Sequence, residues 1–466
     1  MAVNVNQVRP AALAGSFYPA DPGALARMVE DYLDQAQPYH VAPKALIAPH
    51  AGFIYSGAIA GTSYKSIAAR RDTIRRVVLL GPCHRVPVRA FAVPSAEAFA
   101  TPLGIVPIDR PTVDRLAKSE VVEVSDAAHA EEHSLETQLP FLQRALGDFL
   151  IVPVLVGAAP REQVSRLLRA VWGGPETLVV ISSDLSHFLD YEAARGLDIA
   201  ACRSVEALDP DQLNEEQACG RHAIRGLLAQ ARDRDLRATT LDLRNSGDTA
   251  GRNHRERVVG YGSIAFENAA TARLSDSDRA QLLRSAAQSL ASGLRKGKTP
   301  YVAVESFPRA LQAVRASFVT LKVDGDLRGC VGSVKAHRPL IEDVANASCK
   351  AALSDHRFRP LTPEELQSYG NGLDLSVSIL SHPRPIAFGS EVEAIQALNP
   401  WEDGVILRCK NHSGLFLPQV WDTVPRPEKF LATLKRKAGL AEDFWSDDLQ
   451  LYRFRCETFG SNVKLQ

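Results

Sequence analysis

Histidines stand at the ends of three short apolar runs in this sequence. His50 follows KALIAP, His84 follows RRVVLLGPC, and Asp184 and His187 follow TLVVISS. The runs are continuous and rich in β-branched residues, which predicts buried parallel strands. Sites in open α/β sheets form beyond the carboxyl ends of the strands, so we expect these side chains to converge. Imidazoles and a carboxylate in one cleft suit iron, zinc or copper.

Two further segments carry groups that could join this site. Cys219 lies in QACGRHAI, where a thiol is a soft metal ligand, an activated nucleophile or a small buried apolar residue. The segment EEHSLE (131–136) adds His133 and carboxylates, although acids at a helix start are also typical of a solvated surface. One histidine at a strand end can simply cap a loop, whereas three on three strands favour a shared site.

The elements that must position these residues alternate along the first half of the chain. The pattern HSLETQLPFLQRAL (133–146) places four leucines on one face and predicts a helix. Alternating strands and helices predict an α/β domain with a mostly parallel central sheet and flanking helices. The predicted strands are KALIAP (44–49), RRVVLLG (75–81), FLIVPVLVG (149–157) and TLVVISS (177–183).

The second half of the chain has a different pattern. After the strand-like YGSIAF, small residues predict a linker, and SDRAQLLRSAAQSLASGL (277–294) predicts a helix. Period-2 alternation in residues 316–334 and in LDLSVSIL, with the turn Asp324-Gly325, predicts a hairpin and antiparallel strands. We therefore expect an α+β domain here. The predicted division is 1–267 for the first domain, about 268–274 for the linker and 275–466 for the second domain.

Composition narrows the class of protein. The 466 residues contain 54 Lys and Arg and 54 Asp and Glu, so the formal net charge is 54 − 54 = 0. This balance argues against a nucleic-acid-binding protein and against a polybasic membrane-surface protein. Hydrophobic residues make up 45% and charged residues 23%, which excludes global disorder.

Cysteine usage and the N-terminus predict a compartment. The seven cysteines are scattered and contain no Cys-x-x-Cys pair, which argues against a zinc ribbon, an iron–sulfur motif and a disulfide scaffold. The first residues lack the basic segment and apolar core of a signal peptide, and no apolar run approaches the ~20 residues that span a bilayer. Free thiols without an export signal predict the cytoplasm.

Six ordered motifs cover the first half, namely APHAGFIYSG, LLGPCH, EEHSLETQLPFL, SSDLSHF, ACGRHAI and VVGYGSIAF. They resemble the MEMO-like family, which is similar to the class III extradiol dioxygenases of the LigB-like fold. Those enzymes hold Fe(II) on two histidines and a carboxylate. The resemblance implies that His50 and His84 are metal ligands. It also implies that His187 is an acid/base with Asp184 beside it, and that Cys219 lies in the pocket.

A pocket cysteine departs from the dioxygenase pattern, in which the third ligand is a carboxylate. A thiolate is softer and more easily oxidised. A metal bound by His50, His84 and Cys219 would be Fe(II) or copper, and zinc fits the same donors. The implied activity is that of a dioxygenase-like oxidoreductase acting on a small substrate. The alternative is a non-catalytic adaptor that binds a peptide or protein in the same pocket.

The motifs LRGCVGSV, ALSDHRFRPLTPEEL, LSVSIL, DGVILR and GLFLPQV resemble the AMMECR-type domain, over about residues 275–463. In LRGCVGS, glycine lets the backbone approach a ligand and arginine can bind a carboxylate or phosphate, so Arg328 and Cys330 are candidate site residues. A twisted strand with a glycine bulge and a buried thiol is the alternative. The segment SDHRF, which contains Asp355 and Arg357, either adds polar groups to this candidate site or forms an exposed loop.

The fusion of two such domains bears on partners. MEMO-like, AMMECR-type and radical SAM proteins are grouped as the AmmeMemoRadiSam system. The resemblance therefore implies a radical SAM protein as a partner, with an accessory role for this chain as a third hypothesis. Fusion keeps the two domains at high effective concentration, which favours joint action on one substrate.

Overall fold

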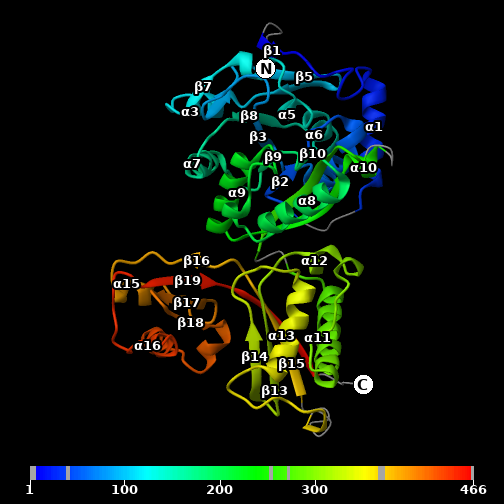
Figure 1. The fold of residues 1–466 in the computed structure, drawn as a ribbon. Coiled ribbons are helices and arrows are strands. Elements are labelled where there is room, and N and C mark those ends of the chain that lie inside the picture. The colour runs from blue at the N-terminus through cyan, green and yellow to red at the C-terminus, as the bar shows by residue number, and fades with distance from the viewer. Residues whose placement is uncertain (1–6, 38–41, 251–254, 270–272, 366–372, 463–466) are drawn as a thin grey trace. The chain divides into compact units, whose positions relative to one another are not determined.

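The computed structural model describes residues 7–37, 42–250, 255–269, 273–365 and 373–462. The chain forms two compact units, Met1–Ala272 (unit one) and Arg273–Gln466 (unit two), whose elements are labelled in Figure 1. Each unit has its own hydrophobic core. Strand β12 ends at Asn268 and helix α11 begins at Asp276, and residues 270–272 of the predicted linker lie outside the described part of the chain.

A mixed sheet forms the centre of unit one, with nine strands among the described residues. Its path runs β10-β12-β2-β9-β3-β8-β4-β7, and β11 pairs with β12. The strands are β2 (Ala45–Ala48), β3 (Arg76–Pro82), β4 (Phe91–Val93), β7 (Val122–Val124), β8 (Leu150–Val156), β9 (Thr177–Ser182), β10 (His187–Leu189), β11 (Leu236–Asn245) and β12 (Val258–Asn268). The four central strands β2, β9, β3 and β8 are parallel, which confirms the predicted parallel core.

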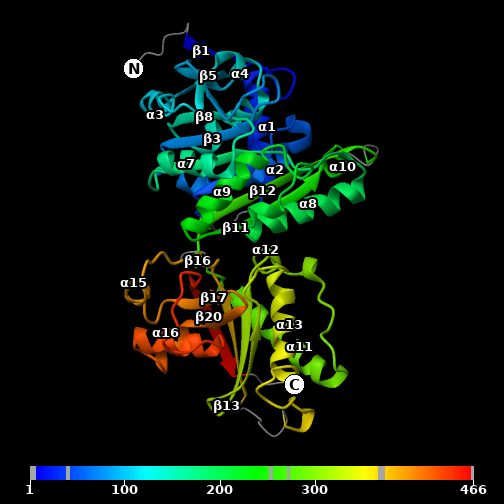
Figure 2. The same cartoon turned by 60° about the vertical axis from the view of Figure 1, so that its left-hand side comes forward.

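Helices cover this sheet and a small second sheet lies beside it. Helices α7 and α9 pack on each other, as do α1 and α2, and α8 lies along β11 and β12 (Figure 2). The helices are α1 (Pro22–Gln35), α2 (Phe53–Lys65), α3 (Arg110–Leu116), α4 (Asp126–Ala130), α5 (His133–Glu136), α6 (Leu139–Ala145), α7 (Arg161–Val171), α8 (Tyr191–Glu206), α9 (Arg221–Asp233) and α10 (Ser246–Thr249). The small sheet contains β1 (Val8–Arg9), β5 (Ala98–Thr101) and β6 (Gly104–Pro107).

The predicted single helix over 133–146 is wrong in one respect, because the segment forms two helices, α5 and α6. Pro140 is the second residue of α6, where its missing N–H has no helical partner to lose. The predicted apolar face is correct, since its four leucines are all buried. Because of this break, α5 and α6 are separate helices whose axes can differ in direction.

Unit two contains two antiparallel sheets in its described residues, with orders β14-β13-β15-β20 and β16-β19-β17-β18. Asp324 and Gly325 both have positive φ between β13 and β14, as the predicted two-residue hairpin turn requires. Helices α11 and α13 pack together against the first sheet. The elements are α11 (Asp276–Lys296), α12 (Arg309–Gln312), β13 (Ser317–Val323), β14 (Asp326–Gly332), α13 (Leu340–Leu353), β15 (Leu373–Leu380), β16 (Arg384–Pro385), α15 (Glu391–Gln396), β17 (Gly404–Cys409), β18 (His412–Phe416), α16 (Pro427–Lys437), β19 (Gln450–Phe454) and β20 (Cys456–Asn462).

Within the described residues, none of the helices combines the length and the apolar character needed to cross a membrane.

A buried histidine of unit one makes its stability depend on pH. Burial lowers the pKa of His129 to about 4 from the ordinary 6.5, while its Nε2 contacts the Ala92 carbonyl at 3.1 Å. Between pH 6.5 and 4 the unfolded chain binds a proton here that the folded chain does not, so stability falls as the pH falls through this window. We expect His129 to contribute a loss of about 2 kcal/mol between pH 7 and pH 5.

Urea unfolding of the full chain at the two pH values measures this loss. His129→Gln, which can still donate to the Ala92 carbonyl, is expected to reduce the pH-dependent loss for unit one by about that amount. An equal loss in wild type and variant would contradict the assignment. The exposed His337 offers a matched control as His337→Gln, which leaves the loss unchanged.

Candidate metal centre

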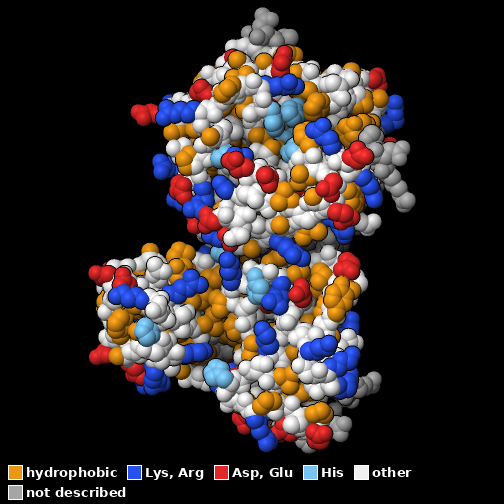
Figure 3. All heavy atoms as spheres, in the orientation of Figure 1, with side chains coloured by type: hydrophobic (Ala, Val, Ile, Leu, Met, Phe, Trp, Pro, Cys, Tyr) orange, Lys and Arg blue, Asp and Glu red, His pale blue; other side chains and the backbone are white. Residues whose placement is uncertain are grey.

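Three histidines meet beyond the ends of the parallel strands. His50 follows β2, His84 follows β3 and His133 begins α5. One ligand atom from each ring lies within 4.8 Å of those of the other two. The rings of His84 and His133 stack with 4.4 Å between centroids, and the His50 ring meets both edge-on at 5.2 Å. His50 is buried, His133 is partly buried and His84 is exposed, so a ligand can approach from the side of His84. Figure 3 shows histidine side chains at the surface of unit one.

A buried hydrogen-bond chain orients His50. Its Nδ1 lies 2.8 Å from the Ser182 hydroxyl at the end of β9. That hydroxyl donates its one hydrogen to the Ser134 carbonyl, so it accepts the hydrogen of His50 Nδ1. The Nε2 atom therefore carries the lone pair that a metal needs. Burial, with the neighbouring His133 and His84, lowers the pKa of His50 well below 6.5 and keeps the ring neutral.

A carboxylate orients His84 in the same way. Its Nδ1 lies 2.9 Å from Glu132 Oε1, and its backbone N–H donates to Glu132 Oε2 at 2.5 Å. Burial alone would raise the pKa of Glu132, but the hydrogen bonds from His84 hold it at about 2. Glu132 is thus ionised and accepts the Nδ1 hydrogen, which leaves Nε2 of His84 for a ligand.

His133 has an unsatisfied nitrogen. Its buried Nδ1 lies 3.2 Å from Glu132 Oε1 but forms no hydrogen bond with any of the described residues. Burial and the adjacent His84 lower the pKa of this ring to about 4, so it is neutral at pH 7. A buried polar atom without a partner is costly unless a ligand or water satisfies it.

Cys219 lies against His50 at the start of α9. Its Sγ is 3.4 Å from His50 Nε2 and accepts from the backbone N–H of Asp184 at 3.3 Å. Gly220 allows this approach, because a Cβ there would lie 2.7 Å from Ser183 Cβ. Burial, then the Asp184 carboxylate, raises the pKa of the thiol to about 12, so the sulfur is protonated until a cation replaces its hydrogen.

Asp184, which the resemblance places beside His187, contacts His50 with its carboxylate. Its Oδ1 accepts from the backbone N–H of His50 at 2.8 Å, and its Oδ2 lies 3.9 Å from His50 Nε2. The reason is the turn after β9, where Asp184 still faces β2 but His187 has entered β10 and pairs with β12. Burial raises the pKa of Asp184 to about 7.

His187 stands apart from the three-histidine group but on the same side of the sheet. Burial lowers the pKa of its ring and nearby His84 lowers it further. The next residue, Phe188, has φ 59°, a conformation that a bulky side chain rarely adopts. This strained backbone beside the cluster is typical of a functional site.

The donor set fits a transition metal. Two imidazoles present Nε2 lone pairs, a third has an orphaned nitrogen, and a thiol completes the group. On one tetrahedral ion, bonds of ~2.1 Å to nitrogen and ~2.3 Å to sulfur place the two donors about 3.5 Å apart. The 3.4 Å between His50 Nε2 and Cys219 Sγ matches this spacing. Imidazole and thiolate donors suit iron, copper and zinc.

Little in the sequence indicates that the carboxylates Glu132 and Glu136 of the segment EEHSLE are buried. We considered a solvated helix start, but Glu132 and Glu136 are 2% and 0% exposed, so that interpretation is wrong. Glu136 pairs with Arg9 at 2.5 Å and accepts from the backbone N–H of Leu13 at 2.8 Å. The one available signal was His133 itself. It is a third histidine, it lies beside two carboxylates, and the other candidate site histidines of the chain follow predicted strands.

In unit two, Arg328 and Cys330 lie on β14, and the pairing of β14 with β13 shifts register at Arg328, as in the bulged strand that we considered. Arg328 donates to the Arg359 carbonyl at 3.0 Å, and Thr320 donates to the Cys330 sulfur at 3.3 Å. Gly329 between them lets the strand approach α13, since a Cβ would lie 2.0 Å from the Ala351 carbonyl. Gly329 therefore permits a close contact between β14 and the backbone of α13.

The segment SDHRF forms a loop in which Ser354, His356 and Arg357 are exposed, as in the alternative that we considered, but Asp355 is buried. Asp355 is 6% exposed and accepts from the backbone N–H of Cys330 at 2.8 Å. Arg357 pairs with Asp355 at 2.7 Å and donates to the Cys330 carbonyl at 3.2 Å. The Arg357 guanidinium holds the pKa of the Asp355 carboxyl well below its usual range. These bonds satisfy the polar groups within unit two and fix no reaction type.

Comparisons with known proteins agree with the two units. Residues 9–265 match the model of the Memo-like protein family, and residues 283–459 match that of AMMECR1. A MEMO1 family protein of Aquifex aeolicus is 35% identical over 273 residues, covering 56% of this chain and 99% of that protein. Protein MEMO1 of Danio rerio is 35% identical over 248 residues, covering 47% and 83%. The crystal structure of an uncharacterized protein from Pyrococcus horikoshii is 32% identical and covers 40% of this chain and 93% of that chain, with a TM-score of 0.37.

Proposed function

Because the chain belongs to the Memo-like protein family, with an AMMECR1 domain fused behind the Memo-like domain, we propose that unit one is a metal-dependent redox enzyme acting on a small oxygenated substrate. The supporting observation is the group of three histidines whose ligand atoms lie within 4.8 Å of one another. Imidazoles whose Nδ1 atoms are held by hydrogen bonds, so that Nε2 remains available to a cation, are typical of metal ligands.

His50, His84 and Cys219 are the proposed ligands. Iron or copper bound there would supply a redox-active Lewis acid. Glu132 fixes His84, and Ser182 fixes His50, so that both rings keep their Nε2 atoms toward the cation. His133 lies close enough to be a fourth donor or to replace the thiolate.

His187 is the proposed general base. Its lowered pKa keeps it neutral near pH 7, where its ring can accept a proton from a substrate hydroxyl. Phe188 is 60% exposed beside it and offers an apolar surface for the body of the substrate.

The test is oxygen consumption by anaerobically purified protein reconstituted with Fe(II) or Cu(I), with a panel of catechols as substrates. We expect turnover in the wild type and a loss of about 100-fold or more in His187→Gln, because a general base contributes roughly 10²–10⁴-fold. Metal content by plasma mass spectrometry is expected to be unchanged in that variant, since His187 is not a proposed ligand.

His222→Gln is the matched control, because His222 is a partly buried histidine on α9 that contacts the Ala159 carbonyl and lies outside the histidine group. It should retain activity. Absence of turnover with either metal at full occupancy, across the panel, would contradict the redox proposal while leaving the metal centre intact.

A further inference from the structure

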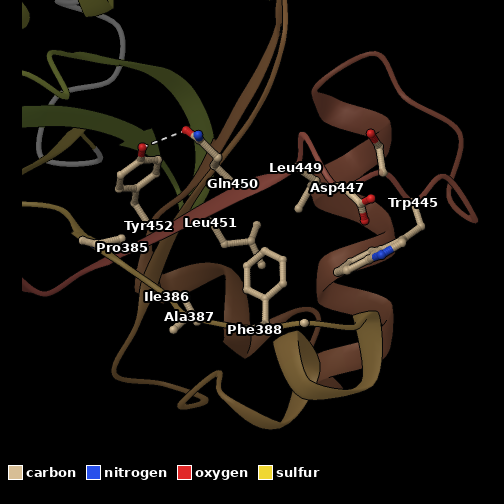
Figure 4. A pocket seen from close by; sticks show the side chains of 12 residues that line it. Pro385, Ile386, Ala387, Phe388, Trp445, Asp447, Leu449, Gln450, Leu451 and Tyr452 are labelled. Carbon is tan, nitrogen blue, oxygen red and sulfur yellow. Dashed lines mark hydrogen bonds between the residues drawn. The ribbon is translucent and has the colours of Figure 1, made fainter.

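A pocket in unit two has no part in the centre described above. It has a volume of about 480 Å³ and lies between the segment that follows β16 and the segment that leads into β19 (Figure 4). A volume of this size is typical of small-molecule sites, and both apolar and polar groups line the pocket. The lining includes Ile386, Phe388, Trp445, Leu451 and Tyr452.

Aromatic side chains form one wall. The rings of Phe388 and Trp445 are 5.5 Å apart and tilted by 58°, and Figure 4 shows both at the same end of the pocket. Both side chains are only partly buried and pack on the core of the second sheet. That packing fixes their rings while part of each remains accessible. Aromatic faces carry negative electrostatic potential and attract cations.

The one charged side chain among the twelve described residues that line the pocket is Asp447. It is exposed, and no described residue forms an ion pair or hydrogen bond with its carboxylate. Two bases near the lining residues are already paired. The Lys435 ammonium, which lies 5.6 Å from the centroid of the Trp445 ring, pairs with Glu391 at 2.5 Å. Arg453, next to Tyr452, lies 3.3 Å from Asp403. The rim therefore presents an uncompensated negative charge beside the aromatic wall.

We propose that this pocket binds a small organic cation with an apolar body, such as an aromatic amine in its ammonium form. The ammonium group would lie between the Asp447 carboxylate and the ring of Trp445. The apolar body would pack on Phe388 and Leu451. A carboxylate and an aromatic face together select for positive charge, whereas the apolar walls alone would not.

Three probes of the same size separate charge from apolar contact, namely benzylamine, benzyl alcohol and benzoate. Ligand-observed NMR titration of the full chain at pH 7 is expected to show that benzylamine binds about fivefold more tightly than benzyl alcohol, with benzoate weakest. Asp447→Asn should remove the difference between the amine and the alcohol. Phe388→Leu should weaken both.

Asp443→Asn is the matched control, because it removes the same charge from the same segment but Asp443 does not line the pocket. It should leave the preference for the amine unchanged. Equal affinity of wild type for benzylamine and benzyl alcohol, or a preference that survives Asp447→Asn, would overturn the proposal, as would no binding of any probe. Circular dichroism of each variant confirms that unit two remains folded.

Discussion

The double variant His50→Ala/His84→Ala is expected to bind Fe(II) and Cu(I) at least about 100-fold more weakly than the wild type. Loss of a group that merely orients a metal ligand costs roughly 10–100-fold in affinity, and this variant removes two ligands outright. Of the remaining donors, Cys219 lies two residues before α9 and His133 is the first residue of α5. Anaerobic titration against a coloured chelator, with metal content by plasma mass spectrometry, measures the change.

The control removes the same number of imidazoles outside the group, as His187→Ala/His222→Ala. That variant should bind metal as the wild type does. Since the buried His50 side chain contacts Ser182 through Nδ1 and Cys219 through Nε2, the stability of each variant is measured by thermal unfolding before the titration. A folded His50→Ala/His84→Ala protein that binds both metals with wild-type affinity would show that the ligand assignment is wrong.

Variants with one substitution each distinguish Cys219 from His133 as the third metal ligand. If Cys219 is a ligand, Cys219→Ser changes the spectrum of the copper-loaded protein, because a thiolate gives a charge-transfer band that a hydroxyl does not. If His133 takes that place, His133→Gln lowers metal content and Cys219→Ser leaves it unchanged. The 3.4 Å between Cys219 Sγ and His50 Nε2 favours the first outcome.

Strand ends were predictable because the signal is local. A continuous apolar run followed by a polar residue marks where a buried parallel strand leaves the sheet, and the general rule for such sheets brings these ends together. His50 and His84 therefore meet as expected, although their strands β2 and β3 are separated by β9. The hairpin at Asp324 is local in the same sense, because two adjacent residues decide it.

The contribution of the α5 segment to the histidine group could not be predicted. The residues that pair with its buried carboxylates, Glu132 and Glu136, are distant in the sequence. Glu132 is buried because it accepts hydrogens from His84, 48 residues earlier. Glu136 is buried because Arg9, 127 residues earlier, reaches it. From the sequence alone, both carboxylates look like the acids that commonly stabilise a helix N-terminus at the surface.

The same contrast between local signals and partners distant in the sequence holds in unit two. Glycine at position 329 was correctly taken to permit a close approach, but sequence could not tell which surface approaches. The structure shows the Ala351 carbonyl of α13 at that point. Asp355 likewise looked exposed because its partner, the backbone N–H of Cys330, carries no side-chain signal.

The largest expected effect on stability is that of Glu136→Ala, a loss of about 3–5 kcal/mol from unit one, because it leaves the Arg9 guanidinium buried without its counterion. Arg9 is 6% exposed, so water cannot replace the lost carboxylate. The substitution also removes the acceptor of the Tyr18 hydroxyl and of the backbone N–H groups of Ala12 and Leu13. Urea unfolding of the full chain, followed by near-ultraviolet circular dichroism, measures the transition of unit one.

Neighbouring substitutions separate the buried charge from a general effect on α5. Glu131→Ala removes a carboxylate five residues away that is exposed to solvent, so it should change stability by less than about 0.5 kcal/mol. Glu136→Gln keeps an acceptor for Tyr18 but not the charge, and it should fall between the two. A loss below about 1 kcal/mol for Glu136→Ala would mean that Arg9 finds another partner, and its carbonyl contacts at His129 and Glu132 are the candidates. Because Glu136 closes the helix that begins at His133, a folded Glu136→Gln protein with weakened metal binding would show that this buried ion pair also positions the histidine group.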